Sequence, residues 1–260
     1  METLRERWAA GKNTLGVWLS TPSSVTAETA GHVGFDYVCV DTQHGASDYQ
    51  VAVGMLQAIA LARAPSIARV PWNEPGIIGK MLDAGAQGVI VPMVNSGEEA
   101  AAVVRAARYP PLGVRSFGPL MASMRTPDYA GVANTLTAVI PMVETVDALK
   151  NLDDILSTRG VDAIYVGPAD LSLSLGLPAG NNDGTAAFDD ALAFIAAACK
   201  RHGVVPGIHA SSALAARRLE QGFRMITVAG DLLAMRMRLA DDLAEARGAE
   251  SKNSTSTAIY

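Results

Sequence analysis

The sequence predicts an α/β fold, a single (β/α)8 barrel of the TIM type. Eight short apolar runs alternate with Ala- and Leu-rich segments of helical periodicity between residues 15 and 246. The runs are apolar at consecutive positions, which is typical of parallel strands buried on both faces. Eight such units in 260 residues match the usual size of this barrel. The competing open dinucleotide-binding sheet would carry a glycine-rich turn after its first strand, and "TPSSVTAE" has no glycine there.

The elements follow one another in a regular order. Strands are predicted at 15–20, 37–41, 66–70, 88–94, 138–144, 163–167, 205–210 and 225–231. The helices that follow them are predicted at 24–32, 49–63, 76–83, 97–108, 146–157, 186–202, 211–221 and 232–246. Residues 109–136 break this rhythm, and we expect an irregular functional or interface loop there. The barrel domain should span 1–247, followed by a polar, disordered tail at 248–260.

Composition excludes several classes of partner. A net charge of −5 and a pI near 5.4 argue against nucleic acid, which usually requires a basic face. No run approaches the roughly 20 apolar residues of a membrane span, and the charged N-terminus lacks the apolar core of a secretory signal. Cys39 and Cys199 lie in apolar patterns without a C-x-x-C motif, as buried free thiols do in a reducing compartment. We therefore expect a cytoplasmic protein that acts on small molecules.

Functional side chains of such a barrel lie at the C-terminal ends of its strands, here called the rim. The residues at or just after the ends of the predicted strands are mostly polar or aromatic. In strand order they are Trp18 and Ser20; Asp41, Gln43 and His44; Arg69; Pro92 and Met93; Glu144; Asp170; His209; and Asp231. We expect these side chains to converge on one site.

Glu144 and Asp170 are the candidate metal ligands. Glu144 directly follows the apolar run "VIPMV", so its carboxylate needs a partner, a cap or a cation. Two carboxylates from neighbouring strands suit a hard divalent ion such as Mg²⁺ or Mn²⁺. The alternative is that one of them only caps the helix that follows. No His/Cys cluster indicates zinc.

Arg69, Asp41 and His44 are the candidates for charge stabilisation and proton transfer. Arg69 could bind a developing oxyanion, pair with Asp41, or do both. His44 ionises near neutral pH and lies just past a strand beside Asp41, which could orient it or hold a water. His209 is a weaker candidate at the same rim.

The sequence lacks the residues that two other kinds of catalysis require. A Schiff-base aldolase needs a lysine on a barrel strand, and all five lysines fall in helical, terminal or loop contexts. No G-x-S-x-G motif supports serine hydrolysis.

Together, in this order, six segments resemble the HpcH/HpaI family of metal-dependent (class II) pyruvate aldolases, which includes 2,4-dihydroxyhept-2-ene-1,7-dioate aldolase. The segments are "FDYVCVDTQHG" (35–45), "ARVPW" (68–72), "MLDAGAQGVIVPMV" (81–94), "GVRSFGP" (113–119), "PMVET" (141–145) and "VGPADLSLSLG" (166–176).

The resemblance implies a role for each rim residue. Glu144 and Asp170 would ligate the divalent ion (Mg²⁺, Mn²⁺ or Co²⁺), which would chelate pyruvate through its carboxylate and keto oxygens. Arg69 would stabilise the enolate oxygen, and His44, helped by Asp41 and Asp83, would move the proton of the aldol hydroxyl.

The same resemblance implies the substrate contacts and the assembly. Backbone N–H groups around Ala169 and Asp170, in the turn of Gly167 and Pro168, would hold the pyruvate carboxylate, and Trp18 would shape the pocket. The assembly would be a hexamer, a trimer of dimers, with the last helix exchanged between barrels. Segments 113–131 and 232–246 are the candidates for these contacts.

Two residues depart from the family pattern. Many members carry Glu at the position of Gln43 and Gln at the position of Met142. A charge beside His44 and a hydrogen bond to substrate are therefore missing here.

The expected activity is reversible aldol cleavage of a 4-hydroxy-2-keto acid to an aldehyde and pyruvate, or a close analogue such as hydroxypyruvate. A metal-dependent CoA-ester lyase of the malyl or citryl type is the alternative, although no basic groove for a nucleotide is evident. A non-catalytic ligand-binding barrel is a third hypothesis, which the intact set of His44, Arg69, Glu144 and Asp170 disfavours.

Overall fold

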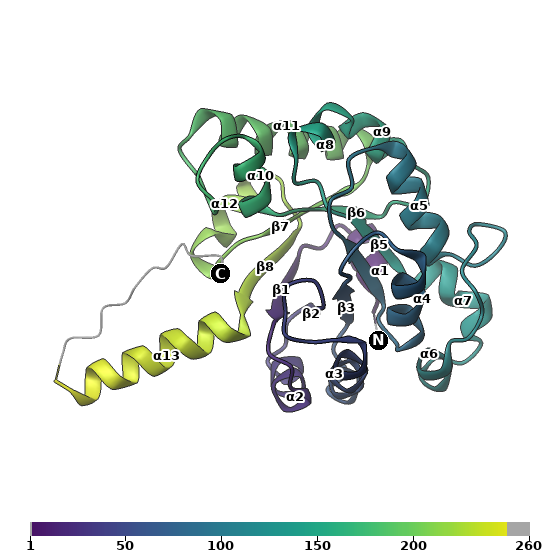
Figure 1. Cartoon of the computed structure of the whole chain (residues 1–260), viewed down its shortest axis with the longest axis horizontal. Helices are drawn as coiled ribbons and strands as arrows, with labels where there is room; N and C mark the ends of the chain where they lie inside the picture. Colours follow the sequence, from purple (N-terminus) through teal and green to yellow (C-terminus); the bar gives the residue numbers. More distant parts are fainter. Residues whose placement is uncertain (1, 249–260) are drawn as a thin grey trace.

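The computed structural model describes residues 2–248, and its strands form a barrel (Figure 1). One parallel sheet has the strand order β5-β4-β3-β2-β1-β8-β7-β6. A bridge between Met142 and Tyr165 nearly closes it between β5 and β6. The strands are β1 (Thr14–Leu19), β2 (Tyr37–Asp41), β3 (Ser66–Arg69), β4 (Gly88–Val91), β5 (Ala138–Pro141), β6 (Ala163–Val166), β7 (Val205–His209) and β8 (Met225–Gly230). The predicted (β/α)8 barrel is confirmed, and residues 249–260 of the tail predicted at 248–260 lie outside the described residues.

The predicted helices form an outer layer around the strands. They are α2 (Ser24–His32), α3 (Tyr49–Leu61), α4 (Pro75–Asp83), α5 (Gly97–Ala107), α8 (Val146–Lys150), α9 (Leu152–Ser157), α11 (Ala186–His202) and α12 (Ala215–Glu220), with a 3-10 turn η1 (Ser212–Leu214) before α12. Side-chain oxygens of Ser23, Asp48 and Ser96 accept backbone N–H groups at the start of α2, α3 and α5. These caps satisfy donors that a helix start leaves unpaired.

The segment 109–136 is only partly irregular: residues 109–119 form no helix or strand, as predicted, but two helices follow. It contains α6 (Leu120–Arg125) and α7 (Tyr129–Leu136). A small core of Tyr109, Ala122, Tyr129 and Ala133 packs beneath them. Each helix is too short to show its period, and Asp128 between them has a left-handed backbone with φ 50°. Packing in this small core therefore stabilises elements that propensity alone would not.

Two further helices have no counterpart in the prediction. They are α1 (Leu4–Ala9), before the first strand, and α10 (Pro168–Ser174), directly after β6. α1 plugs the N-terminal end of the barrel, because Leu4 and Trp8 join the cluster that fills its interior. α10 instead lies at the rim, where it carries Asp170 in its first turn.

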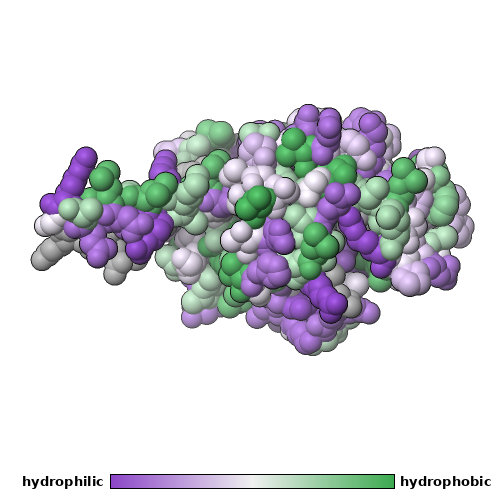
Figure 2. Space-filling model, turned by 90° about the horizontal axis from the view of Figure 1, so that it is seen from below, coloured by the Kyte–Doolittle hydropathy of each residue, from purple (hydrophilic) through white to green (hydrophobic). Residues whose placement is uncertain are grey.

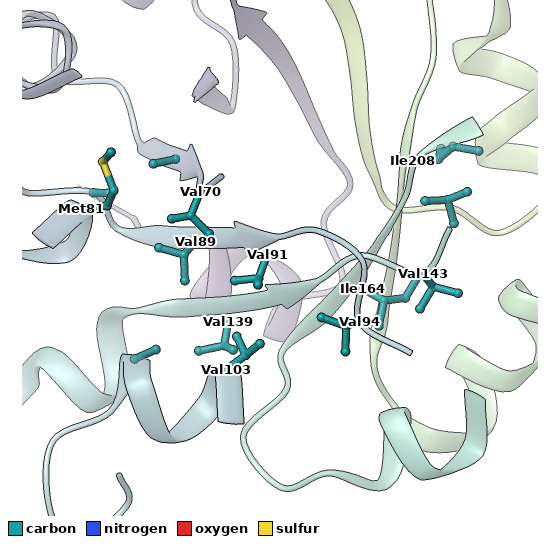
Figure 3. Packing of buried hydrophobic residues seen from close by; sticks show 14 of the residues in the cluster. Val70, Met81, Val89, Val91, Val94, Val103, Val139, Val143, Ile164 and Ile208 are labelled. Carbon is teal, nitrogen blue, oxygen red and sulfur yellow. The ribbon is translucent and has the colours of Figure 1, made fainter. Parts of the chain in front are cut away.

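Two apolar layers hold the barrel together. Residues that point outward, such as Val89, Val139 and Ile208, pack between strands and helices (Figure 3). Alternate residues point inward and fill the barrel, Tyr37 among them. Burial of each large side chain contributes about 1.5–3 kcal/mol. A Cβ on Gly16 would lie 2.1 Å from the Tyr37 ring, so glycine in β1 makes room for this tyrosine.

The last helix, α13 (Asp231–Ala246), forms as predicted but projects away from the barrel (Figures 1 and 2). None of its residues is buried within the described chain. Leu232, Met235, Leu239 and Leu243, at helical spacing, are 48–61% exposed. An amphipathic helix normally buries such a stripe. Within residues 2–248 no helix is long and apolar enough to cross a membrane.

Candidate active site

The site lies at the C-terminal mouth of the barrel, and its β2–β3 side is built on an ion pair. Arg69 Nε and Nη2 donate to the two carboxylate oxygens of Asp41 at 2.9 and 2.6 Å. The side chains are only 2% and 1% exposed. A bidentate pair of this kind fixes both groups. The pairing alternative for Arg69 is therefore confirmed.

Trp18 completes this side. Its indole Nε1 donates to Asp41 Oδ2 at 3.1 Å, and the Arg69 guanidinium lies 4.8 Å from the centre of its ring. Burial raises the pKa of Asp41, but the hydrogen bonds and charge of Arg69, with the Trp18 bond, outweigh it and lower that pKa below its usual value. Asp41 is therefore a carboxylate at neutral pH.

His44 lies in the loop after β2 and is exposed. Asp41 Oδ1 accepts the backbone N–H groups of Gln43 at 3.0 Å and His44 at 3.3 Å. Within residues 2–248 Asp41 thus orients the backbone of His44, and its hydrogen bonds do not reach the imidazole ring. The Gln43 Oε1 atom is buried and lacks a hydrogen-bond partner among the described residues.

On the β5–β6 side, Glu144 is 2% exposed and only half satisfied. Its Oε1 accepts the Met93 backbone N–H at 2.8 Å, whereas Oε2 has no partner in the described chain. Met93 has φ 55°, a conformation that costs a non-glycine residue free energy and clusters at functional sites. Burial, reinforced by the charge of Asp170, raises the pKa of Glu144 to about 7.

Gly167, directly after β6, and Asp170, in the first turn of α10, lie next to Glu144. A Cβ on Gly167 would lie 2.3 Å from Glu144 Oε2, so only glycine leaves the carboxylate its room. No side chain caps α10, and Asp170 stands in its first turn. Thr145, not Glu144, caps α8 by accepting the Ala148 N–H at 3.0 Å. The capping alternative for Glu144 is therefore wrong.

This pair of carboxylates fits a divalent ion. One buried oxygen without a partner and a second carboxylate nearby form a hard, anionic donor set. No group of three or more His, Cys, Asp and Glu residues gathers within residues 2–248, so the chain would supply two ligands and leave other positions to water or substrate.

The β7 side carries a polar network inside the barrel. The Tyr165 hydroxyl lies 2.5 Å from Thr227 Oγ1 and 3.4 Å from His209 Nδ1, and Tyr37 bonds the same threonine at 2.9 Å. Trp18 stacks on Tyr165 at 5.5 Å between ring centres and meets His209 edge-on at 5.1 Å. His209 is the last residue of β7 and contacts Trp18, so it lies at the mouth, as its position at a strand end predicted.

Two predicted residues are not brought into this site. Asp83 ends α4 near the opposite end of the barrel, where it pairs with Arg115 at 2.6 Å. Asp231 accepts the backbone N–H groups of Ser20 and Thr21, both at 2.9 Å, and so fastens the loop after β1. Its position at a strand end reflects a structural hydrogen bond.

Sequence reasoning missed three contributors. The Met93 N–H cannot be predicted from residue type, since every residue except proline has a backbone N–H. Tyr165 and Thr227 lie within strand runs, where an apolar core is the default expectation, although a hydroxyl at an interior position indicates a buried polar network.

The chain matches known proteins over nearly its whole length. The family model described as HpcH/HpaI aldolase/citrate lyase matches residues 14–236. A 4-hydroxy-2-oxo-heptane-1,7-dioate aldolase of Salmonella arizonae is 38% identical over 258 residues, 96% of each chain.

Solved structures of proteins named for the same family are similar to this chain. An HpcH/HpaI aldolase/citrate lyase family protein from Burkholderia cenocepacia superposes with a TM-score of 0.88 at 35% identity, covering 95% of this chain and 100% of that one. An HpcH/HpaI aldolase from Desulfitobacterium hafniense gives 0.87 at 27% identity, covering 97% and 100%.

Proposed function

This chain belongs to the HpcH/HpaI aldolase/citrate lyase family, and on that premise we propose that it is a metal-dependent pyruvate aldolase. Its reaction is the reversible cleavage of a 4-hydroxy-2-keto acid. The C3–C4 bond breaks, the C4 hydroxyl loses its proton, and C4 leaves as an aldehyde. The electron pair stays on C3 as the pyruvate enolate, which is then protonated. The names of the curated relatives favour this activity over CoA-ester cleavage.

The observation that carries the proposal is the bare oxygen of Glu144. A buried carboxylate with an unpartnered Oε2, a neighbouring Asp170 and a pKa near 7 is poorly stabilised by the chain itself. When bound, a divalent ion supplies the Lewis acidity that stabilises negative charge on the keto oxygen. The residues that would hold it are Glu144 and Asp170.

Arg69 is proposed to stabilise the enolate oxygen. Its fork is fixed by Asp41 on one edge and by the Trp18 ring on one face, so the cation needs no reorganisation as charge develops. Asp41 and Trp18 are thereby positioning groups for Arg69, and Trp18 also walls the pocket.

Proton transfer is assigned to His44. It is exposed and anchored through its backbone to Asp41, so its ring can exchange protons with water at the mouth. Asp83 lies at the other end of its own barrel, so a part for Asp83 requires the site of a neighbouring subunit. Backbone N–H groups of Ala169 and Asp170, at the uncapped start of α10, are proposed to hold the substrate carboxylate.

The exposed apolar stripe of α13 points to an oligomeric assembly. We propose a hexamer, a trimer of dimers, in which α13 packs its stripe of Leu232, Met235, Leu239 and Leu243 on a neighbouring barrel. Leu239→Asp should therefore lower the mass measured by light scattering after size exclusion. An unchanged mass would contradict the exchange of α13.

The activity is tested with racemic 4-hydroxy-2-oxoheptane-1,7-dioate, the compound in the relatives' name. Pyruvate release should stop in EDTA and return with Mg²⁺, Mn²⁺ or Co²⁺. Turnover that survives complete metal removal would overturn the metal-dependent mechanism, and cleavage of malyl-CoA or citryl-CoA instead would favour the alternative lyase.

A further inference from the structure

A cavity of about 870 Å³ lies at the N-terminal end of the barrel, opposite the proposed active site. Its walls come from the starts of β3 and β4, the turns that precede these strands, and the helices α6 and α7. None of the proposed catalytic or metal-binding residues lines it. Its volume falls within the range of small-molecule sites, so the cavity is a candidate for a second binding site.

Of the described residues that line the cavity, only Arg63 and Arg125 are charged. Arg63 stands in the turn after α3 and Arg125 is the last residue of α6, so the two cations come from different elements. At the same end of the barrel, Arg5 and Arg108 pair with Asp162 at 2.8 and 2.7 Å, whereas neither Arg63 nor Arg125 pairs with a carboxylate within residues 2–248. The cavity therefore carries two positive charges that the described chain does not neutralise.

Arg125 lies over the turn that follows α4. Its Nη1 donates to Ala84 O at 3.5 Å, too long for a strong hydrogen bond, and a Cβ on Gly85 would collide with the same nitrogen. Burial lowers the pKa of the Arg125 guanidinium, and no carboxylate opposes this shift. A partly desolvated cation without a counter-ion is unfavourable, and a bound anion would compensate it.

Arg63 has φ 59°, the left-handed conformation that glycine usually supplies after a helix. This conformation costs a non-glycine residue free energy, and such residues cluster at ligand sites and other functional positions. Arg63 is exposed and lines the cavity, so its guanidinium can reach an anion bound there.

Gln87 supplies a polar group to the wall between these cations. Its N–H donates to Ser66 O at 2.7 Å and its carbonyl accepts the Ala138 N–H at 2.9 Å, so its backbone is fixed at the strand starts. Val89, two residues later, belongs to the outer apolar layer, and side chains of a strand alternate, so Gln87 also points outward, toward the helices. Gln87 Oε1 is buried and has no hydrogen-bond partner within the described chain. An amide oxygen can only accept, so the partner it lacks is a donor such as a hydroxyl group.

The two cations and the amide oxygen define the chemistry of a ligand. Two guanidinium groups and no lining acid match a dianion, and a phosphate monoester offers three terminal oxygens that two guanidinium forks can bind. Inorganic phosphate would fill only a small part of about 870 Å³, so an organic group should accompany the phosphate. A hydroxyl group on that organic part would donate to Gln87 Oε1.

We propose that the cavity between α3, α6 and the starts of β3 and β4 is a second binding site, for a small hydroxylated organic phosphate held by Arg63, Arg125 and Gln87. The site lies at the end of the barrel away from Glu144 and does not depend on the proposed aldolase activity.

Isothermal titration calorimetry of the full-length protein tests the site with glycerol 3-phosphate, propyl phosphate and inorganic phosphate. Propyl phosphate has the same charge and nearly the same length as glycerol 3-phosphate but no hydroxyl groups. We expect glycerol 3-phosphate to bind with a Kd about tenfold below that of propyl phosphate, and inorganic phosphate to bind more weakly than either. The Kd of glycerol 3-phosphate should be the same in EDTA and in Mg²⁺, and the same in Glu144→Gln as in the wild type.

Variants separate the charge from the hydroxyl contact. Arg63→Ala and Arg125→Ala should each raise the Kd of both organic phosphates about tenfold. Gln87→Met should raise the Kd of glycerol 3-phosphate to that of propyl phosphate and leave the latter unchanged. Arg159→Ala, at an exposed arginine outside the cavity, is the matched control and should bind both as the wild type does. Thermal melting of each variant checks that it folds.

Three results would overturn the proposal. The first is no measurable binding of glycerol 3-phosphate to the wild-type protein. The second is binding that disappears in EDTA or in Glu144→Gln, which would place the phosphate at the metal site of the mouth. The third is a Kd that Arg63→Ala and Arg125→Ala both leave unchanged. A preference for glycerol 3-phosphate that Gln87→Met retains would overturn the hydroxyl contact.

Discussion

The two sides of the barrel mouth treat a buried carboxylate in opposite ways. Asp41 and Glu144 are 1% and 2% exposed. Both oxygens of Asp41 are bonded and its charge meets Arg69, so its pKa is lowered. Glu144 has one bare oxygen, and its burial, reinforced by the charge of Asp170, raises its pKa to about 7. The chain therefore satisfies the carboxylate of the β2–β3 side by itself, whereas on the β5–β6 side it leaves Glu144 Oε2 without a partner among residues 2–248.

Replacing each carboxylate by its amide separates these roles most sharply, and Glu144→Gln should have the largest effect on activity. Loss of a metal ligand should lower kcat/KM at least about a thousandfold, several kcal/mol of transition-state stabilisation. The metal-free variant should melt at or above the wild-type temperature at pH 8, since a desolvated charge is gone. Wild-type turnover, or a markedly lower melting temperature, would remove Glu144 from the proposed role.

The same exchange at Asp41 should act on folding. Asp41→Asn leaves the Arg69 guanidinium buried without a counter-charge, which should cost about 3–5 kcal/mol of unfolding free energy. Urea denaturation of the metal-free protein measures it. A loss no larger than that of Glu144→Gln would erase the distinction between the two sides.

Arg69→Lys tests the bidentate geometry of the guanidinium group and should have an intermediate effect on activity. An ammonium group keeps the charge but cannot bond both oxygens of Asp41 and still offer a fixed donor to an enolate, so kcat should fall about a hundredfold. Steady-state kinetics with saturating metal measures this, and near-normal kcat would contradict the oxyanion role.

The contributions of Glu144 and Asp41 to folding stability should change in different pH ranges. Between about pH 4.5 and 7 folded Glu144 holds a proton that the unfolded chain releases, so the metal-free protein should lose stability as pH rises through this window. Glu144→Gln should remove that loss. Asp41, with a lowered pKa, contributes stability above about pH 4, which is lost only on further acidification. Denaturation at a series of pH values measures the free energy of unfolding and so checks both trends. A stability that rises through the Glu144 window in the wild type but not in Glu144→Gln would contradict the predicted trend.

The sequence alone predicted the barrel and most of the mouth, because apolar runs mark parallel strands and a polar residue after such a run lies at the rim. Glu144, Asp170, Arg69 and Trp18 were found in this way. The same rule included Asp231, which only fastens a loop, because position at a strand end does not distinguish a ligand from a structural acceptor.

Other features depend on tertiary contacts. α6 and α7 are too short for a visible period and are held by the small core of Tyr109, Ala122, Tyr129 and Ala133. The location of Asp83 depends on the direction of α4, which runs back toward the N-terminal end of the strands. The unpaired Oε2 of Glu144 appears only when every neighbouring donor and acceptor is located.

Glu144 and Asp170 are proposed to bind a divalent ion at the β5–β6 side. Titration of the metal-free protein with Mn²⁺, with free Mn²⁺ followed by electron paramagnetic resonance, tests it most directly. We expect one ion per chain in the wild type and in Asp147→Asn, the exposed neighbouring control, and none at the same concentrations in Glu144→Gln. Equal Mn²⁺ binding by wild type and Glu144→Gln would contradict the proposed site of Glu144 and Asp170.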